Sequence, residues 1–520
     1  MKGAIAAGHP LTAEAGARIL EEGGNAVDAC VAAALVGWIA ESPLTGAGAG
    51  GFMLVHRARD RRSALLDFFV AVPGRGAAPG GADMERVDVQ FDRQTAQTFL
   101  VGPASCAVPG FVAGLAGAHR LYGRLPWREL VAPAVELARA GVVLDPPRAY
   151  LHAILDPVLR RDDQGRKIYG RSGPLGVGDR VEMRDLAATL EGLAAEGADG
   201  FYRGELARRI SGHVREAGGR ITEADLAAYR VIRRRPVRAA FRRCEFVSNA
   251  PPSAGGLLIA FALRILDRLG RPAELGSELA IVALAEVMRE AAAARDGSFA
   301  RELRRGGAAK RLLADSRIAG AARRARSALL EPVREPAGLP STTHVSVLDA
   351  TGNAASLSSS LGCGSGVIVP GTGVQLNNML GELDVNPAGV TAPPGARLSS
   401  MMSPSLLVEG GRPRLVVGSA GSERLRGAIL QVVVNVVDHG LGVAEAIGAP
   451  RVHLDGDILH LEGGTDPAVA DRVAERGYEL VRWSERNLFF GGVAAVALAD
   501  GGRLEAAGDL RRGGAGVVVP

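Results

Sequence analysis

The chain has 520 residues, enough for two to four ordinary domains or for one large α/β domain. Its 47% hydrophobic and 22% charged residues are typical of a globular protein, and its 70 glycines predict many turns and close backbone contacts. The net charge is only +5, because 61 basic residues are almost balanced by 56 acidic ones. With 4% aromatic residues, no basic run is interleaved with stacking rings, so we expect no nucleic-acid partner.

The cysteines and the apolar runs exclude two further classes of protein. The four cysteines are too widely spaced to suggest a disulfide framework. The longest apolar run, residues 29–40, is too short to span a bilayer and predicts a buried core helix, so no membrane partner is expected. The first residues lack the apolar segment of a secretory signal, which favours a cytoplasmic location.

The first hundred residues predict a strand, two helices, a glycine loop and a hairpin. Helices are expected from residue 11 or 12 to Gly23 and then from Asn25, whose side chain can cap the second helix together with Asp28. Residues 46–51 form the glycine loop, and residues 52–56 and 63–68 are two strand-like runs. Residues 103–326 then have a mostly helical pattern, and residues 301–340 predict exposed helix and linker.

At residue 341 the pattern changes to alternating apolar and polar residues. A strand pair is expected around the turn at residues 349–353, with its first strand starting abruptly at Thr342. The remainder predicts a β-rich segment with helices at residues 425–439 and 467–476 and further strands in the following runs: 367–369, 405–408, 414–417, 458–461 and 493–498.

Two motifs invite functional interpretations that their context does not favour. The glycine loop satisfies the G-x-G-x-x-G pattern, but a helix precedes it and a strand follows, the reverse of a dinucleotide site. Tight backbone packing near a site is the favoured interpretation. His453 and His460 flank two aspartates, which allows a metal site, although a hairpin turning at residues 455–457 explains the same residues without a metal.

Thr342 is a candidate nucleophile only if the peptide bond before it is cut. A threonine hydroxyl is a weak nucleophile, and the α-amine of the same residue, with an ordinary pKa of about 7.7 to 8, can act as its base near neutral pH. Taken alone, two threonines at the start of a strand are explained by ordinary β propensity.

Motifs spread over nearly the whole chain resemble the γ-glutamyltranspeptidase family. They are the segments at residues 6–10, 22–29, 50–53, 107–110, 122–127, 251–256, 342–344, 370–373, 376–378 and 398–401. The resemblance implies an α+β fold, the four-layer αββα sandwich of N-terminal-nucleophile hydrolases with an additional helical layer. It also implies self-cleavage between Ser341 and Thr342 into an α-rich large chain (1–341) and a β-rich small chain (342–520), which remain together as a heterodimer. No metal and no cofactor are implied.

The resemblance also assigns roles to residues by position. Thr342 becomes the nucleophile and, through its amine, the base, and Ser360 hydrogen-bonds it and assists cleavage. Gly421 and Ser422 provide the backbone N–H groups of the oxyanion hole. Ser399 and Ser400 contact the α-carboxylate of the substrate, and Glu382 holds its α-amine.

Three positions depart from the family pattern on the substrate side. Phe69 stands where the transpeptidases have an arginine that pairs with the α-carboxylate of the γ-glutamyl group, so a charged pair is replaced by an apolar wall. Gly362 stands where asparagine is usual, and Met379 where glutamine or a similar polar residue is common. Arg75 or Arg397 offers a replacement cation. The segment from residue 382 to residue 399 is also short and proline-rich, which predicts an open cleft without a lid loop.

We therefore expect a self-cleaving amide hydrolase or acyltransferase that acts on a small-molecule amide with a weakly polar or γ-glutamyl-like acyl group. One alternative is a true γ-glutamyltransferase that hydrolyses glutathione-like donors. A second alternative is a scaffold that folds without cleaving itself.

Overall fold

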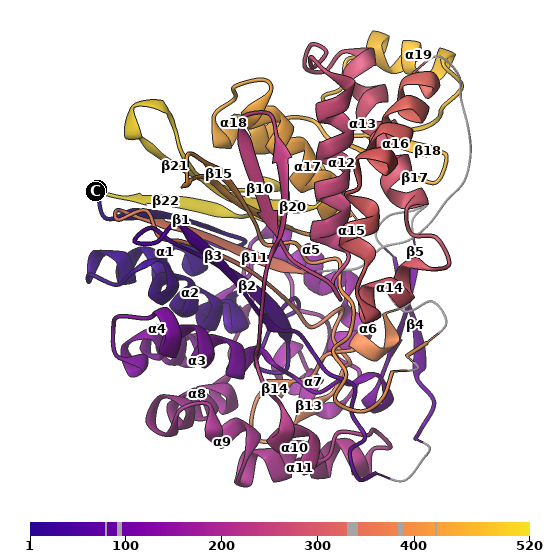
Figure 1. Ribbon diagram of the computed structural model, residues 1–520. Coiled ribbons are helices and arrows are strands. Elements are labelled where there is room, and N and C mark those ends of the chain that lie inside the picture. Colours follow the sequence, from indigo (N-terminus) through magenta and orange to yellow (C-terminus); the bar gives the residue numbers. More distant parts are fainter. Residues whose placement is uncertain (78–80, 91–95, 330–341, 383–388, 391, 422–423) are drawn as a thin grey trace.

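The computed structural model describes residues 1–520 except 78–80, 91–95, 330–341, 383–388, 391 and 422–423. Two large sheets stack face to face at its centre, since β11 and β12 contact β16, and β11 contacts β20 (Figure 1). The seven-stranded sheet has the order β22 (Ala515–Val519), β1 (Gly3–Ala7), β11 (Thr343–Asp349), β12 (Ala354–Ser360), β2 (Gly50–Arg57), β3 (Arg62–Phe68) and β8 (Ile232–Arg234). The six-stranded sheet has the order β21 (Leu504–Gly508), β20 (Gly492–Leu498), β16 (Arg412–Ala420), β15 (Ser405–Glu409), β10 (Cys244–Ser248) and β9 (Val237–Phe241).

Helices cover the outer face of each sheet and complete four layers (Figure 1). On the seven-stranded sheet lie α1 (Pro10–Glu21), α2 (Ala26–Ala40) and α3 (Phe111–Tyr122), and beyond them α4 (Trp127–Ala140), α8 (Arg184–Glu196), α9 (Asp199–Tyr202), α10 (Glu205–Glu216) and α11 (Glu223–Ala228). On the six-stranded sheet lie α12 (Gly255–Leu269) and α17 (Arg424–Val437), backed by α13 (Glu278–Ala293) and α16 (Asp315–Ala328). The expected αββα sandwich and its extra helical layer are confirmed.

Shorter elements complete the chain. The helices are α5 (Pro146–Ile154), α6 (Asp156–Leu159), α7 (Asp163–Tyr169), α14 (Phe299–Arg305), α15 (Ala308–Leu312), α18 (Val443–Gly448), α19 (Pro467–Glu475), and the 3-10 turns η1 (Pro103–Ser105), η2 (Met379–Gly381), η3 (Leu488–Phe490), η4 (Asp500–Gly502) and η5 (Leu510–Arg512). The small sheets are β4 (Glu85–Gln90) with β5 (Ala96–Val101), β6 (Val142–Val143) with β7 (Arg180–Val181), β13 (Ile368–Val369) with β14 (Val374–Gln375), and β17 (Val452–Asp455) with β18 (Ile458–Leu461) and β19 (Glu479–Arg482).

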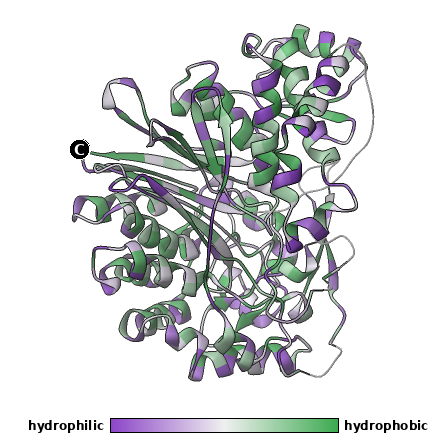
Figure 2. Cartoon of the chain, viewed as in Figure 1, coloured by the Kyte–Doolittle hydropathy of each residue, from purple (hydrophilic) through white to green (hydrophobic). Residues whose placement is uncertain are grey.

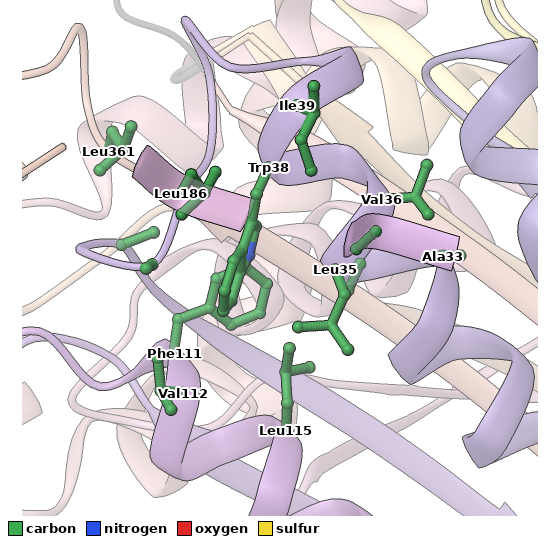
Figure 3. Close-up of a cluster of buried hydrophobic side chains, with 14 of the residues drawn as sticks. Ala33, Leu35, Val36, Trp38, Ile39, Phe111, Val112, Leu115, Leu186 and Leu361 are labelled. Atoms are coloured by element: carbon green, nitrogen blue, oxygen red, sulfur yellow. The ribbon is translucent and has the colours of Figure 1, made fainter. Parts of the chain in front are cut away.

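Helix α2 is the buried core helix that its apolar run predicts, and all 15 of its residues are buried. A helix that is apolar all round must be covered on every side, and α2 contacts α1, α3, α4, β11 and β12. Asn25 and Asp28 form the predicted capping box at its start. Trp38, near its end, packs on Phe111 of α3 with ring centroids 5.9 Å apart (Figure 3). Hydrophobic residues also follow the strands and the inward helix faces through the rest of the molecule (Figure 2).

The helical interpretation of residues 103–326 is incomplete. Within it, β9 and β10 form a hairpin on the edge of the six-stranded sheet, and β8 extends the seven-stranded sheet. The alternating burial of β9 is a strand signature that Val237, Ala239 and Phe241 already carried in the sequence. As a result, residues before position 341 and residues after position 342 contribute strands to both sheets, and β1 pairs with both β11 and β22. The division into chains at this point stays a prediction.

The two doubtful motifs are structural in this fold. Gly48 of the glycine loop forms a bridge with Leu376, and an added Cβ there would lie 2.0 Å from the carbonyl oxygen of Gln375. This is the close backbone packing expected of the loop. His453 and His460 face each other across the β17–β18 hairpin. Within the described residues, no three His, Cys, Asp or Glu side chains are grouped to hold a metal ion, and no helix is long and apolar enough to cross a membrane.

Candidate active site

A row of residues across four neighbouring strands joins the predicted nucleophile to the predicted acyl-binding end. Thr343 pairs with Ser359, so Thr342, directly before β11, lies opposite Ser360. Ser360 pairs in turn with Gly50. Gly51 pairs with Phe68, which brings Phe69 beside Gly50. With about 4.8 Å between strands, the backbones of Thr342 and Phe69 are about 14 Å apart.

The face of β11 that carries Thr342 points between the two sheets and is lined with hydroxyl groups. His344, on the same face, hydrogen-bonds Ser358 through Nδ1 (2.8 Å) and Ser346 through Nε2 (2.9 Å). The Ser346 hydroxyl donates to the carbonyl of Ala494 in the other sheet (3.0 Å). Burial lowers the pKa of His344 to about 3, so its imidazole is neutral near pH 7. A neutral imidazole has one donor and one acceptor nitrogen, so the ring links the hydroxyl groups of Ser358 and Ser346.

Gly418 of β16 leaves the space that the His344 ring fills. A Cβ at this position would lie 2.2 Å from Cε1 and 2.3 Å from Nδ1 of the ring. Because both ring nitrogens are hydrogen-bonded, the ring has no freedom to move away. The contact between the two sheets next to the nucleophile thus depends on a glycine.

The opposite face of β11 holds a buried carboxyl group that the sequence did not single out. Glu41, at the C-terminal end of α2, accepts hydrogen bonds from the hydroxyl groups of Thr343 and of Thr12 (3.0 Å for Thr12). Burial raises the pKa of Glu41, and the neighbouring Arg148 and Arg512 oppose that shift. A carboxylate directly after the apolar run of residues 29–40 was the signal in the sequence. It ties the residue after Thr342 to α2.

A cavity of about 40 Å³ adjoins Thr342, large enough for one or two water molecules. It is bordered by polar side chains from both halves of the chain, among them Glu41, Arg148 and Arg512. Burial lowers the pKa of Arg512 to about 10, which leaves it cationic at neutral pH. Thr342 itself is 4% exposed.

Gly421, one of the two predicted oxyanion residues, directly follows β16. Gly421 is buried and has φ +112°, a conformation that side chains rarely adopt, and it directly follows Ala420, which borders the same cavity as Thr342. The turn therefore comes close to the nucleophile. Ser422 and Ser341 lie outside the described residues, so the structure does not place the second donor or the cleavage point.

The predicted acyl-binding residues are spread over the neighbouring loops. Ser400 is buried, and its carbonyl accepts hydrogen bonds from the Ser253 hydroxyl (2.6 Å) and the Ala254 N–H (2.8 Å). Ser399 is half-buried. Glu382 is buried, and an added Cβ at Gly362 would lie 2.6 Å from its Oε1. These residues, like the others of the candidate site, keep their roles as predictions.

Gly362 and Met379 are built into the fold at their unusual positions. Gly362 has φ +71°, its N–H donates to the Ser360 hydroxyl (2.8 Å), and a Cβ would lie 1.9 Å from Oδ1 of Asn378. The asparagine usual in the family does not fit this backbone. Met379 is buried in a hydrophobic cluster that includes residues of both sheets.

Phe69 and Arg397 occupy the far end of the row. Phe69 is 2% exposed and stacks on Phe52, with centroids 5.3 Å apart. Arg397 lies behind it and forms an ion pair with Asp67 (3.2 Å), donates to the carbonyl of Phe69 and covers the ring of Tyr229 (4.7 Å). The guanidinium of Arg397 is therefore occupied by Asp67, by the backbone carbonyl of Phe69 and by the ring of Tyr229. Arg75 lies farther along the chain, against Gly395.

The γ-glutamyltranspeptidase family model matches residues 12–519. The chain belongs to the γ-glutamyltranspeptidase family. It is 34% identical to the acylase ACY 1 proenzyme of Pseudomonas sp. strain SE83, over 100% of this chain and 94% of that protein. It is 31% identical to the glutathione hydrolase proenzyme of Escherichia coli strain K12, over 98% of this chain and 90% of that protein.

Solved structures of this family share the fold. The cephalosporin acylase from Bacillus halodurans aligns with a TM-score of 0.85 and 26% identity, covering 99% of this chain and 95% of that one. The γ-glutamyltranspeptidase of Helicobacter pylori aligns with a TM-score of 0.53 and 29% identity, covering 61% of this chain and 89% of that chain. The family member described here is therefore an amide hydrolase or transferase of the γ-glutamyltranspeptidase and acylase type.

Proposed function

We propose that this protein is a self-cleaving acylase that uses Thr342 to hydrolyse amides whose acyl group is not a free γ-glutamyl residue. The observation that carries the proposal is the row from Thr342 to Phe69. At one end stand a threonine at the start of a strand and a serine opposite it. At the other end stands a buried phenyl ring where a carboxylate-binding arginine would be needed.

Cleavage before Thr342 frees the α-amine that the chemistry requires. In the proposed reaction, the amine takes the proton of Thr342 Oγ while that oxygen attacks the amide carbonyl. The N–H groups of Gly421 and Ser422 stabilise the oxyanion, and the amine returns the proton to the leaving nitrogen. Water or a second amine then releases the acyl group, and the cavity beside Thr342 has room for that water.

The charges around the cavity favour a neutral amine. Arg148 and Arg512 both border it, and nearby cations lower the pKa of an amine. Glu41 also borders the cavity, and burial raises the pKa of this carboxyl group. His344 is neutral near pH 7 and adds no charge. The new N-terminus is therefore expected to act as a base at neutral pH.

The two chains expected after cleavage would stay together as a heterodimer. Both sheets combine strands from before residue 341 with strands from after residue 342, and in the seven-stranded sheet β1 lies between β22 and β11. Separating them would break ladder hydrogen bonds and expose both cores.

Two measurements test the proposal. Intact mass should show the 53.8 kDa chain converting into two fragments with a threonine at the new N-terminus. Turnover of a panel of acyl anilides should favour neutral acyl groups over γ-glutamyl. A single uncut chain without turnover would instead support the scaffold interpretation.

True γ-glutamyl transfer is the second candidate, because Glu382, Ser399 and Ser400 are all present. Rapid, Thr342-dependent turnover of γ-glutamyl anilide, at a rate equal to or above that of the neutral acyl anilides, would establish it and overturn the altered specificity.

A further inference from the structure

Beyond Phe69, a second hollow of about 840 Å³ opens at the β8 edge of the seven-stranded sheet. Five arginines from three separate segments of the chain line it, and none of the described residues that line it is acidic. We call it the basic pocket, and its lining includes Arg234, Arg301, Arg304, Arg305 and Arg397.

The charge of the basic pocket is largely unbalanced. Asp67, which is wholly buried, forms ion pairs with Arg234 (2.6 Å) and with Arg397 (3.2 Å). Arg301, Arg304 and Arg305 are exposed and make no ion pair with any residue that the structure describes. Two of the five guanidinium groups therefore share one carboxylate, and the other three have none among the residues that the structure describes. A concave cluster of this kind is suited to carboxylate or phosphate oxygens.

The pocket continues the row that begins at the nucleophile. Asp67 of β3 pairs with Ile232 of β8, and Ile232 and Arg234 line the pocket. Arg397, which also lines it, donates to the carbonyl of Phe69, whose backbone is about 14 Å from that of Thr342. The pocket thus begins beyond Phe69, whose backbone lies roughly three strand spacings from that of Thr342.

We propose that the basic pocket binds the anionic end of an elongated acyl donor whose amide carbonyl is attacked by Thr342. This inference rests on the proposed function and adds a substrate class to it. The phenyl ring at position 69 disfavours a carboxylate close to the scissile bond, whereas the arginines accept one farther along the chain. The substrates are therefore amides with a long acyl chain that ends in a carboxylate or another anion.

The test compares acyl anilides of increasing length that end in either a carboxylate or a carboxamide. For long chains, kcat/KM of the carboxylate should exceed that of the carboxamide at least tenfold at low salt, and the ratio should fall as salt is added. The triple variant Arg301→Gln, Arg304→Gln, Arg305→Gln should reduce this ratio about tenfold and leave carboxamide turnover within twofold. Its unfolding temperature should be unchanged, because all three side chains are exposed.

A matched triple variant separates the effect of charge in the basic pocket from the effect of the overall charge of the protein. Arg128→Gln, Arg203→Gln, Arg323→Gln removes the same charge from exposed positions outside the pocket and should leave the ratio unchanged. An equal loss in both variants, or no loss in the pocket variant, would overturn the inference while leaving the acylase proposal intact. Inorganic phosphate could also inhibit competitively while the carboxylate-ended and carboxamide-ended anilides are turned over equally well. The pocket would then bind free anions without selecting the acyl donor, and the inference would be overturned as well.

If no anilide is turned over, the proposed function fails. A binding measurement then still tests whether the basic pocket holds the anionic end of an amide. The Thr342→Ala chain should then bind a long monocarboxylate amide at least tenfold more tightly than its carboxamide counterpart, and the pocket variant should abolish the difference. Equal affinities would overturn the inference.

Discussion

The two ends of the row from Thr342 to Phe69 are built in opposite ways. At the Thr342 end, buried polar side chains satisfy one another: His344 with Ser358 and Ser346, and Glu41 with Thr343. At the Phe69 end, a phenyl ring is stacked in the core, and the charges lie behind it on Arg397 and Asp67. Under the proposed function, the end of the site that attacks the amide is retained while the end that binds the acyl group is rebuilt.

The largest effect is expected from Thr342→Ala, which removes the attacking oxygen. Self-cleavage and amide turnover should both fall by more than about a thousandfold, because no other group replaces a covalent nucleophile. Mass spectrometry and anilide turnover measure the two losses. Thr342→Ser, which keeps a hydroxyl, should retain partial cleavage and serves as the control. Full activity in Thr342→Ala would refute the assignment of the nucleophile.

Gly418→Ala tests the packing between the sheets at the attacking end. The new Cβ would meet the His344 ring at 2.2 Å, and overpacking of this kind costs roughly 1–3 kcal/mol of unfolding free energy. Denaturant unfolding measures the loss. The control is Gly192→Ala on α8, where a Cβ meets nothing within 4 Å and alanine favours the helix. Equal stability of the two variants would contradict the role given to Gly418.

Phe69→Arg replaces the apolar ring at the other end of the row with a guanidinium group. The ratio of kcat/KM for γ-glutamyl anilide to that for a neutral acyl anilide should rise about tenfold, the effect of one charge-assisted hydrogen bond. The unfolding temperature should fall, because the ring is 2% exposed and stacked on Phe52. Phe69→Leu, which stays apolar, should leave the ratio unchanged. A ratio that does not respond to the arginine would exclude position 69 from substrate choice.

The last prediction concerns pH. The pKa of His344 is about 3 in the folded protein and ordinarily 6.5, so between these values the unfolded chain binds more protons. The unfolding free energy should therefore fall as pH drops below 6.5, by up to about 1.4 kcal/mol per pH unit for this residue. His344→Asn should flatten the dependence between pH 6.5 and 4.5. His213→Asn on α10 is the control and should keep the slope of the unaltered protein.

Much of the fold followed from local patterns. The apolar residues of α2 and the capping box formed by Asn25 and Asp28 could be read directly, and so could the β2–β3 and β11–β12 hairpins. The β9–β10 hairpin was missed because its short strands are embedded among helices. For the site, the sequence and the family resemblance supplied Thr342, Ser360 and Gly421, and the structure places them around the start of β11 and the end of β16.

The remaining features depend on contacts between distant segments. Glu41 meets Thr343 across 302 positions of sequence, and Arg397 meets Phe69 across 328, so no local pattern connects them. By itself, the sequence determined the strands of the β2–β3 and β11–β12 hairpins and the presence of Phe69 where the family resemblance leads us to expect an arginine, because both depend on residue identity along the chain. Only the tertiary structure decided that Phe69 stacks in the core and that five arginines gather at one sheet edge, because strand register and packing bring those residues together.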